Sequence, residues 1–254
     1  MSTEKRHPNW ISESTLVKIQ AMSGAVFGGF LSLHLINAMT ASFGENAYES
    51  TMGIFRKVYQ PHPIFEIVVI GGSAIVHMAT AFVRIRNRRK ISAGQNTGTE
   101  FSIVDFAKKL HRYAGYYLAT FIGGHVFFTR GPFFKMGVPG NFGVVANGLF
   151  NLPVIFYPYY TLLGISGLYH LTYGAIQASK VLGYKPPAWT SVRSRTFWTW
   201  IGFGSAFLFS AVLAFGGNYF PVQQEKFLPF IQFANNLFKQ QTTCRNDLYT
   251  KNEL

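Results

Sequence analysis

Four histidines lie inside long apolar stretches of this sequence, and they are the residues best placed to do chemistry. They are His34, His77, His125 and His170, one in each of four successive apolar runs. Ionisable side chains inside membrane segments are costly and usually functional. A hydrogen bond to a neighbouring helix explains a single membrane histidine, but four of them need a joint explanation.

Five apolar runs must position these histidines, and each is near the 20 or so residues that a helix needs to cross a bilayer. The chain has 254 residues, of which 48% are hydrophobic and 13% charged, whereas soluble domains average about 25% charged. These totals predict an all-α membrane protein with five transmembrane helices. We expect an inner-side segment 1–15, a transmembrane domain 16–215 and a polar tail 216–254. The runs cover residues 16–39, 64–85, 110–128, 152–178 and 196–215.

The net charge of +13 is unevenly placed along the chain. Residues 86–109 hold six basic residues against two acids, and residues 180–195 hold four against none. The positive-inside rule then puts the N-terminus and these two loops on the cytoplasmic or matrix side. The basic side chains fit attraction to anionic lipid alone, or also the docking of an acidic soluble partner. Nucleic acid is a poor partner, because the charges flank membrane spans.

Depth in the membrane sorts the four histidines into two pairs. At 1.5 Å per residue, His34 and His125 lie about 27 and 22 Å from the inner ends of their runs. His77 and His170 each lie 8 residues from the inner end, about 12 Å deep. Each pair comes from alternate runs, which lie diagonally across an up-down four-helix bundle. Two diagonal imidazoles at one depth suit the two faces of a haem iron.

Zinc is the competing ligand, but a zinc ion takes about four protein ligands at one place, and these histidines fall at two depths. Small residues accompany each histidine, among them Gly24, Gly72, Gly115 and Gly164. They suit a porphyrin face and equally suit close helix packing.

Together these stretches resemble the five-helix dihaem cytochrome b subunit of succinate dehydrogenases and fumarate reductases, over roughly residues 16–215. The matching segments are IQAMSGAVFGGFLSLHLIN, FEIVVIGGSAIVHMATAF, HRYAGYYLATFIGGHVFFTR and YHLTYGAIQASKVLGY. The resemblance implies two b-type haems, the outer one held by His34 and His125 and the inner one by His77 and His170. The first four helices would form the bundle around them.

The same resemblance implies partners and a location. Electrons from succinate would enter through flavoprotein and iron–sulfur subunits docked on the basic inner face, and would reach a membrane quinone. The dicarboxylate chemistry would lie on those subunits. The membrane, whose lipid the chain contacts, would be the mitochondrial inner membrane or a bacterial plasma membrane.

A second family shares these helices. The stretch FRKVYQPHPIFEIVVIGGSAIVH also resembles mitochondrial outer-membrane adaptors that recruit a lipid-transfer protein. That alternative makes the chain an interaction protein, with or without the haem sites. A cytochrome b561-like ascorbate reductase is a third alternative, but that class usually has a different helix count.

Four further polar residues lie at or near the ends of these runs. Arg84 and Arg112 are expected to bind the inner haem propionates, or else to snorkel to lipid phosphate. Glu66 follows Pro63 in the first turn of its run, where a carboxylate suits the positive helix end. Its alternative role is proton handling or quinone binding. We expect His111, at the inner boundary, to face water or lipid rather than to ligate.

Overall fold

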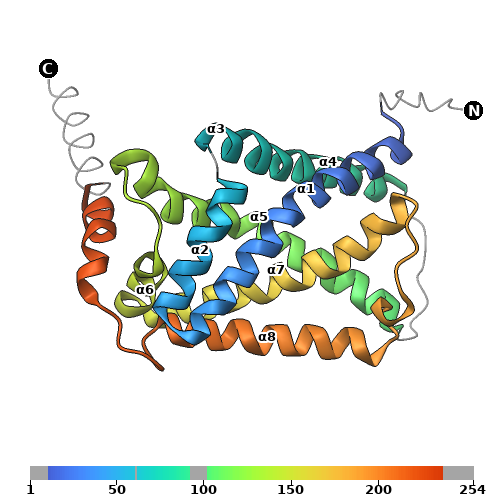
Figure 1. The fold of residues 1–254 in the computed structure, drawn as a ribbon. Helices are drawn as coiled ribbons and strands as arrows, with labels where there is room; N and C mark the ends of the chain where they lie inside the picture. The colour runs from blue at the N-terminus through green and yellow to red at the C-terminus, as the bar shows by residue number, and fades with distance from the viewer. Residues whose placement is uncertain (1–10, 61, 92–101, 237–254) are drawn as a thin grey trace, which may run out of the picture. The chain divides into compact units, whose positions relative to one another are not determined.

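The computed structural model describes residues 11–60, 62–91 and 102–236 (Figure 1). Residues 1–10, 61, 92–101 and 237–254, and the basic side chains of residues 88–90, lie outside the described part of the chain. The described chain is helical and contains no strand, as the sequence predicts. Its α-helices are α1 Glu13–Thr40, α2 Glu45–Tyr59, α3 Pro63–Phe65, α4 Gly72–Ile91, α5 Ile103–Met136, α6 Phe142–Asn151, α7 Pro153–Val181 and α8 Arg195–Phe215.

All five apolar runs are helical. The second run is continuous through α3, the π-helical segment η2 Glu66–Gly71, and α4. Its start is fixed locally: Pro63 occupies the first turn, and the His62 ring accepts a hydrogen bond from the Ile64 N–H at 3.2 Å, which is a helix cap. α5 ends at Met136, and the next residue, Gly137, has a φ of 70°, which glycine adopts readily.

Three helical segments within the described residues are long and apolar enough to cross a membrane. They are Glu13–Phe43, Pro63–Asn87 and Arg195–Phe215. The chain therefore has the character of a membrane protein. α5 and α7 are longer than the predicted runs, at 34 and 29 residues, but histidines and tyrosines lower their hydropathy.

The chain divides into two compact units, which share α1, α2, α5, α7 and α8. The first contains residues Met1–Leu35, Ile54–Tyr116 and Gly167–Phe203, and the second contains the rest. In the first unit, Ala107, Tyr169 and Phe197 belong to a buried core. The Tyr169 hydroxyl donates to the Ala107 carbonyl at 2.9 Å, which ties α7 to α5. This core joins α7, which carries His170, to α5 and α8.

The second unit has an aromatic core of its own. Tyr48, Phe142, Phe215 and Phe227 are buried in it, and the Phe142 and Phe215 rings lie 4.5 Å apart. Lys226 pairs with Glu45. The segment 216–254, expected as a polar tail, thus includes residues packed into this core.

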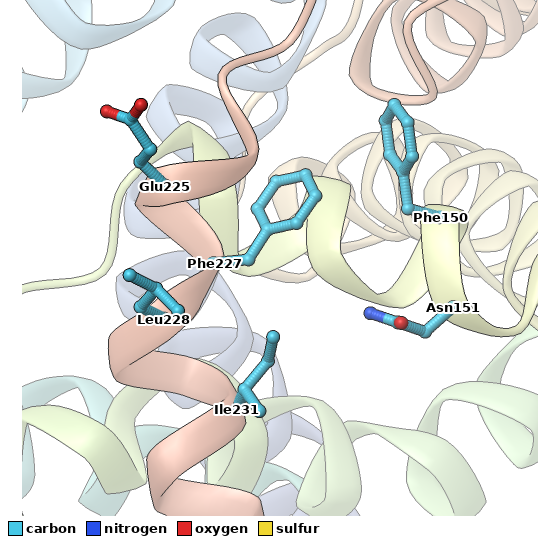
Figure 2. A pocket seen from close by; sticks show the side chains of 6 residues that line it. All are labelled: Phe150, Asn151, Glu225, Phe227, Leu228 and Ile231. Carbon is cyan, nitrogen blue, oxygen red and sulfur yellow. The ribbon is translucent and has the colours of Figure 1, made fainter.

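Residues 228–236, just after the short helix η4 Gln224–Phe227, are also helical. Figure 2 shows Phe227, the last residue of η4, directed toward α6. Its ring lies 5.3 Å from the ring of Phe150. These contacts border a cavity of about 430 Å³.

Candidate functional site

The structure brings His77 of α4 and His170 of α7 together in the first unit. Their ring centres lie 6.1 Å apart, and the ring planes are nearly perpendicular, at 89°. These are the two histidines that the depth argument places in the inner layer. They are 93 positions apart in the sequence, so the fold creates this pair.

Both rings are fixed through the same nitrogen. His77 Nδ1 lies 3.1 Å from the Gln20 carbonyl oxygen of α1, and His170 Nδ1 lies 3.2 Å from the His111 carbonyl oxygen of α5. A carbonyl can only accept, so each Nδ1 donates its proton. Each Nε2 then carries the lone pair that ligates a metal. Metal-binding histidines commonly donate their second ring N–H in this way.

Two glycines make room for the rings. A Cβ on Gly24 of α1 would lie 2.8 Å from His77 Nδ1, and a Cβ on Gly115 of α5 would lie 2.9 Å from His170 Cε1. Both distances are too short for real side chains, so any other residue would displace the imidazoles. From the sequence alone, a glycine that leaves room for a ring cannot be told from a glycine that lets two helices pack closely. In the structure, these two glycines leave room for the rings.

These residues fit the group that the sequence predicts. An imidazole nitrogen ligates a transition metal at about 2 Å and lies roughly 1 Å from its ring centre, so two rings sharing one ion have centres roughly 6 Å apart. The distance between His77 and His170 matches that value. In the part of the chain that is described, no group of three or more His, Cys, Asp or Glu side chains could hold a metal ion. Haem iron needs only two axial ligands from the protein.

His111 corrects the sequence analysis, which expected its ring to face water or lipid. The ring instead stacks on His170, with centres 4.1 Å apart and planes at 12°, and it lies 4.8 Å from the Tyr173 ring. His111 Nδ1 is buried and has no hydrogen-bond partner among the described residues. His111 and His125 are 14 residues apart, which is close to four helical turns. This spacing in the sequence indicates that His111 lies on the same face of α5 as the predicted ligand His125.

Arg84, a predicted propionate partner, joins α4 to α1 through the hydrogen bonds of its guanidinium. Its Nε donates to Glu13 Oε1 at 2.9 Å, and its Nη1 donates to the side chain of Gln20. Gln20 is also the residue whose carbonyl fixes His77. The second predicted partner, Arg112, lies exposed on α5. Binding of propionates by either arginine stays a prediction.

Replacing Arg84 with alanine should lower the free energy of unfolding by about 1 kcal/mol. The pair with Glu13 is partly solvated, with side-chain exposures of 18% and 47%, so most of the loss comes from the bond to Gln20. Thermal unfolding of the detergent-solubilised protein measures it. Lys18→Ala, an exposed position on α1, is the control. Equal melting temperatures for the two variants would contradict the role of Arg84.

The outer histidines belong to different units. His34 lies in the first unit, where its ring stacks on Phe30 with centres 5.6 Å apart. His125 lies in the second, 6.3 Å from the Tyr160 ring. Their pairing on one iron stays a prediction.

Glu66 opens the π-helical segment η2, and its Oε1 accepts from Gln60 Nε2 at 3.0 Å. π-helical turns occur often at functional sites. A role in proton handling or quinone binding stays a prediction for this residue.

No protein-family description, curated protein or solved structure matches the chain.

Proposed function

We propose that the chain is the dihaem cytochrome b membrane anchor of a succinate:quinone oxidoreductase of the succinate dehydrogenase or fumarate reductase type. It would cross the membrane five times, with the first four spans around two b-type haems. The observation that carries the proposal is the pair His77 and His170, whose ring spacing, carbonyl partners and glycine clearance all suit one shared iron.

Within this proposal, His77 and His170 hold the inner haem through Nε2. The carbonyls of Gln20 and His111 set the tautomer and the direction of each ring. The bound haem would supply one-electron transfer between an iron–sulfur partner and a membrane quinone. His34 and His125 would hold the second haem, and Glu66 would serve quinone or its protons.

The partner surface follows from the charges of the first unit. Six basic residues at the predicted inner side are exposed: Lys108, Lys109, Lys180, Lys185, Arg193 and Arg195. Asp105, in the same region, pairs with Lys108 at 3.1 Å. Such a surface attracts an acidic soluble subunit and speeds its association.

Purification of the full chain from its own membrane in mild detergent tests the proposal. Flavoprotein and iron–sulfur subunits should co-purify, and succinate should reduce the cytochrome. A haem spectrum without those subunits, from outer-membrane fractions, would contradict the anchor function and favour the adaptor. No haem spectrum at all would overturn the histidine assignment as well.

Reversing charge on the basic surface should weaken retention of the partner subunits. The double variant Lys185→Glu with Arg193→Glu is expected to lower their affinity roughly tenfold or more at low salt, because two attractive contacts become repulsive. Quantitative co-purification at several salt concentrations measures the change. Lys57→Glu, exposed on the predicted outer side, is the control. If it has the same effect as the double variant, the docking surface is misplaced.

A further inference from the structure

His111 touches the proposed inner haem site without being one of its two predicted ligands. Its ring stacks on the His170 ring, with centres 4.1 Å apart and planes at 12°. Its backbone carbonyl accepts the hydrogen bond from His170 Nδ1 at 3.2 Å. One residue of α5 therefore contacts both the face and an edge of the His170 ring.

The His111 ring is itself held by packing against α7. Its centre lies 4.8 Å from that of the Tyr173 ring, and a Cβ on Gly174 would lie only 3.4 Å from His111 Cε1. The buried Nδ1 of His111 has no hydrogen-bond partner among the described residues. What the ring offers His170 is therefore a flat surface in a fixed position.

The stacked arrangement excludes His111 as a further ligand of the same ion. The lone pair of an imidazole nitrogen lies in the plane of its ring. Lone pairs in two nearly parallel planes, with ring centres 4.1 Å apart, do not converge on one ion. In agreement, no group of three or more His, Cys, Asp or Glu side chains in the described part of the chain could hold a metal ion.

A stacked neighbour can fix the plane of the His170 ring, which a hydrogen bond alone does not. A hydrogen bond keeps most of its strength over about 30° of misalignment, so the bond to the His111 carbonyl leaves the ring some freedom to turn. A ring packed on the face of His170 opposes that turn, because it would drive atoms of one ring into the other. The His170 plane is thus held nearly perpendicular to that of His77, at 89°.

The angle between two axial imidazole planes has a measurable consequence. In oxidised haem iron, each ring acts on one of two otherwise equivalent d orbitals, chosen by the direction of its plane. Parallel rings act on the same orbital and split the pair, whereas perpendicular rings leave the two nearly equal in energy. Electron paramagnetic resonance (EPR) reports this splitting, because the maximum g value rises as the splitting shrinks.

We propose that His111 is a positioning residue for the inner haem, and that its stacked ring holds the His170 imidazole perpendicular to that of His77. The inference rests on the proposed function, since it requires a haem between His77 and His170. It adds a residue that acts through a ligand, because the surroundings of the axial ligands tune a haem.

EPR spectra of the oxidised, purified full chain test the proposal. The unchanged protein should show a low-spin signal with a large maximum g value, and His77→Ala should remove it, which assigns the signal to the inner haem. His111→Ala keeps the backbone carbonyl but loses the stack, so this maximum g value should fall. His111→Phe keeps a flat ring and should retain the original value. Both variants keep both ligands, so their haem content should not change.

Tyr113→Ala is the control, because it removes a ring of α5 that is 66% exposed. Its EPR signal should match that of the unchanged protein. An inner haem without a large maximum g value, no change in His111→Ala, or the same change in Tyr113→Ala would overturn the positioning role while leaving the haem in place. If the unchanged protein shows no haem at all, the proposed function falls as well.

The phenylalanine variant decides the case in which His111→Ala fails to keep its inner haem. Retention of the haem and of the original maximum g value in His111→Phe would support the stack. Loss of the inner haem from both variants, or a lowered maximum g value in His111→Phe, would contradict it, because the imidazole nitrogens of His111 would then be essential.

Discussion

Replacing His77 with alanine should remove one haem and leave the other. In the proposed site, His77 and His170 would each supply one ligand to the inner haem iron, and the His170 ring, whose centre lies 6.1 Å away, could not take the place of His77. The haem content per chain is therefore expected to fall by about half. Pyridine haemochrome assay of the purified variant measures the content, and the reduced spectrum shows which band is lost. His170→Ala should give the same remaining spectrum.

His62→Ala is the control for this pair of variants. His62 is exposed at the start of α3, and its ring only caps a helix. It should keep the full haem content, with at most a small loss of stability. Loss of both haems from His77→Ala, or of neither, would contradict the pairing of His77 with His170.

Alanine at Gly24 or Gly115 should also remove the inner haem, although neither residue ligates. The new methyl group would come within 2.8 to 2.9 Å of the His77 or His170 ring. The ring must then move and lose its bond to the Gln20 or His111 carbonyl. Haem content is again expected to fall by about half, and measurement of the remaining spectrum identifies the lost site.

The same helices provide matched controls. Gly29 of α1 and Gly123 of α5 would place a Cβ with no atom of another group within 4 Å. Alanine there should retain both haems and stabilise the helix by up to about 1 kcal/mol. The site variants should therefore lose haem, whereas the control variants should keep it and gain stability. If Gly24→Ala and Gly29→Ala behave alike, the clearance argument is wrong.

The sequence predicts the helices better than it predicts their contacts. Every apolar run is helical, because the length and composition of each run determine that outcome. The short helices α2 and α6 lie in predicted loops, and α6 has only 10 residues, so neither gives a long apolar run. α5 and α7 show the converse, since their tyrosines and histidines lower the hydropathy of helices long enough to cross a bilayer.

The candidate site was partly accessible from the sequence. Depth along the runs pairs His77 with His170, since helical rise converts residue number into distance. The supports of the two rings were not accessible. The rings are held by the backbone carbonyls of Gln20 and His111. Every residue has such a carbonyl, so residue type does not reveal this role. The stacking of His111 depends on how α5 and α7 pack, which residue spacing alone does not determine.

The haem content and reduced-minus-oxidised spectrum of the purified, unaltered chain test the central claim most directly. The account predicts a sharp reduced α-band of the b type, with about two haems for each chain. A chain that is folded and monodisperse in detergent but shows no such band would contradict it, because the paired imidazoles would then hold no iron.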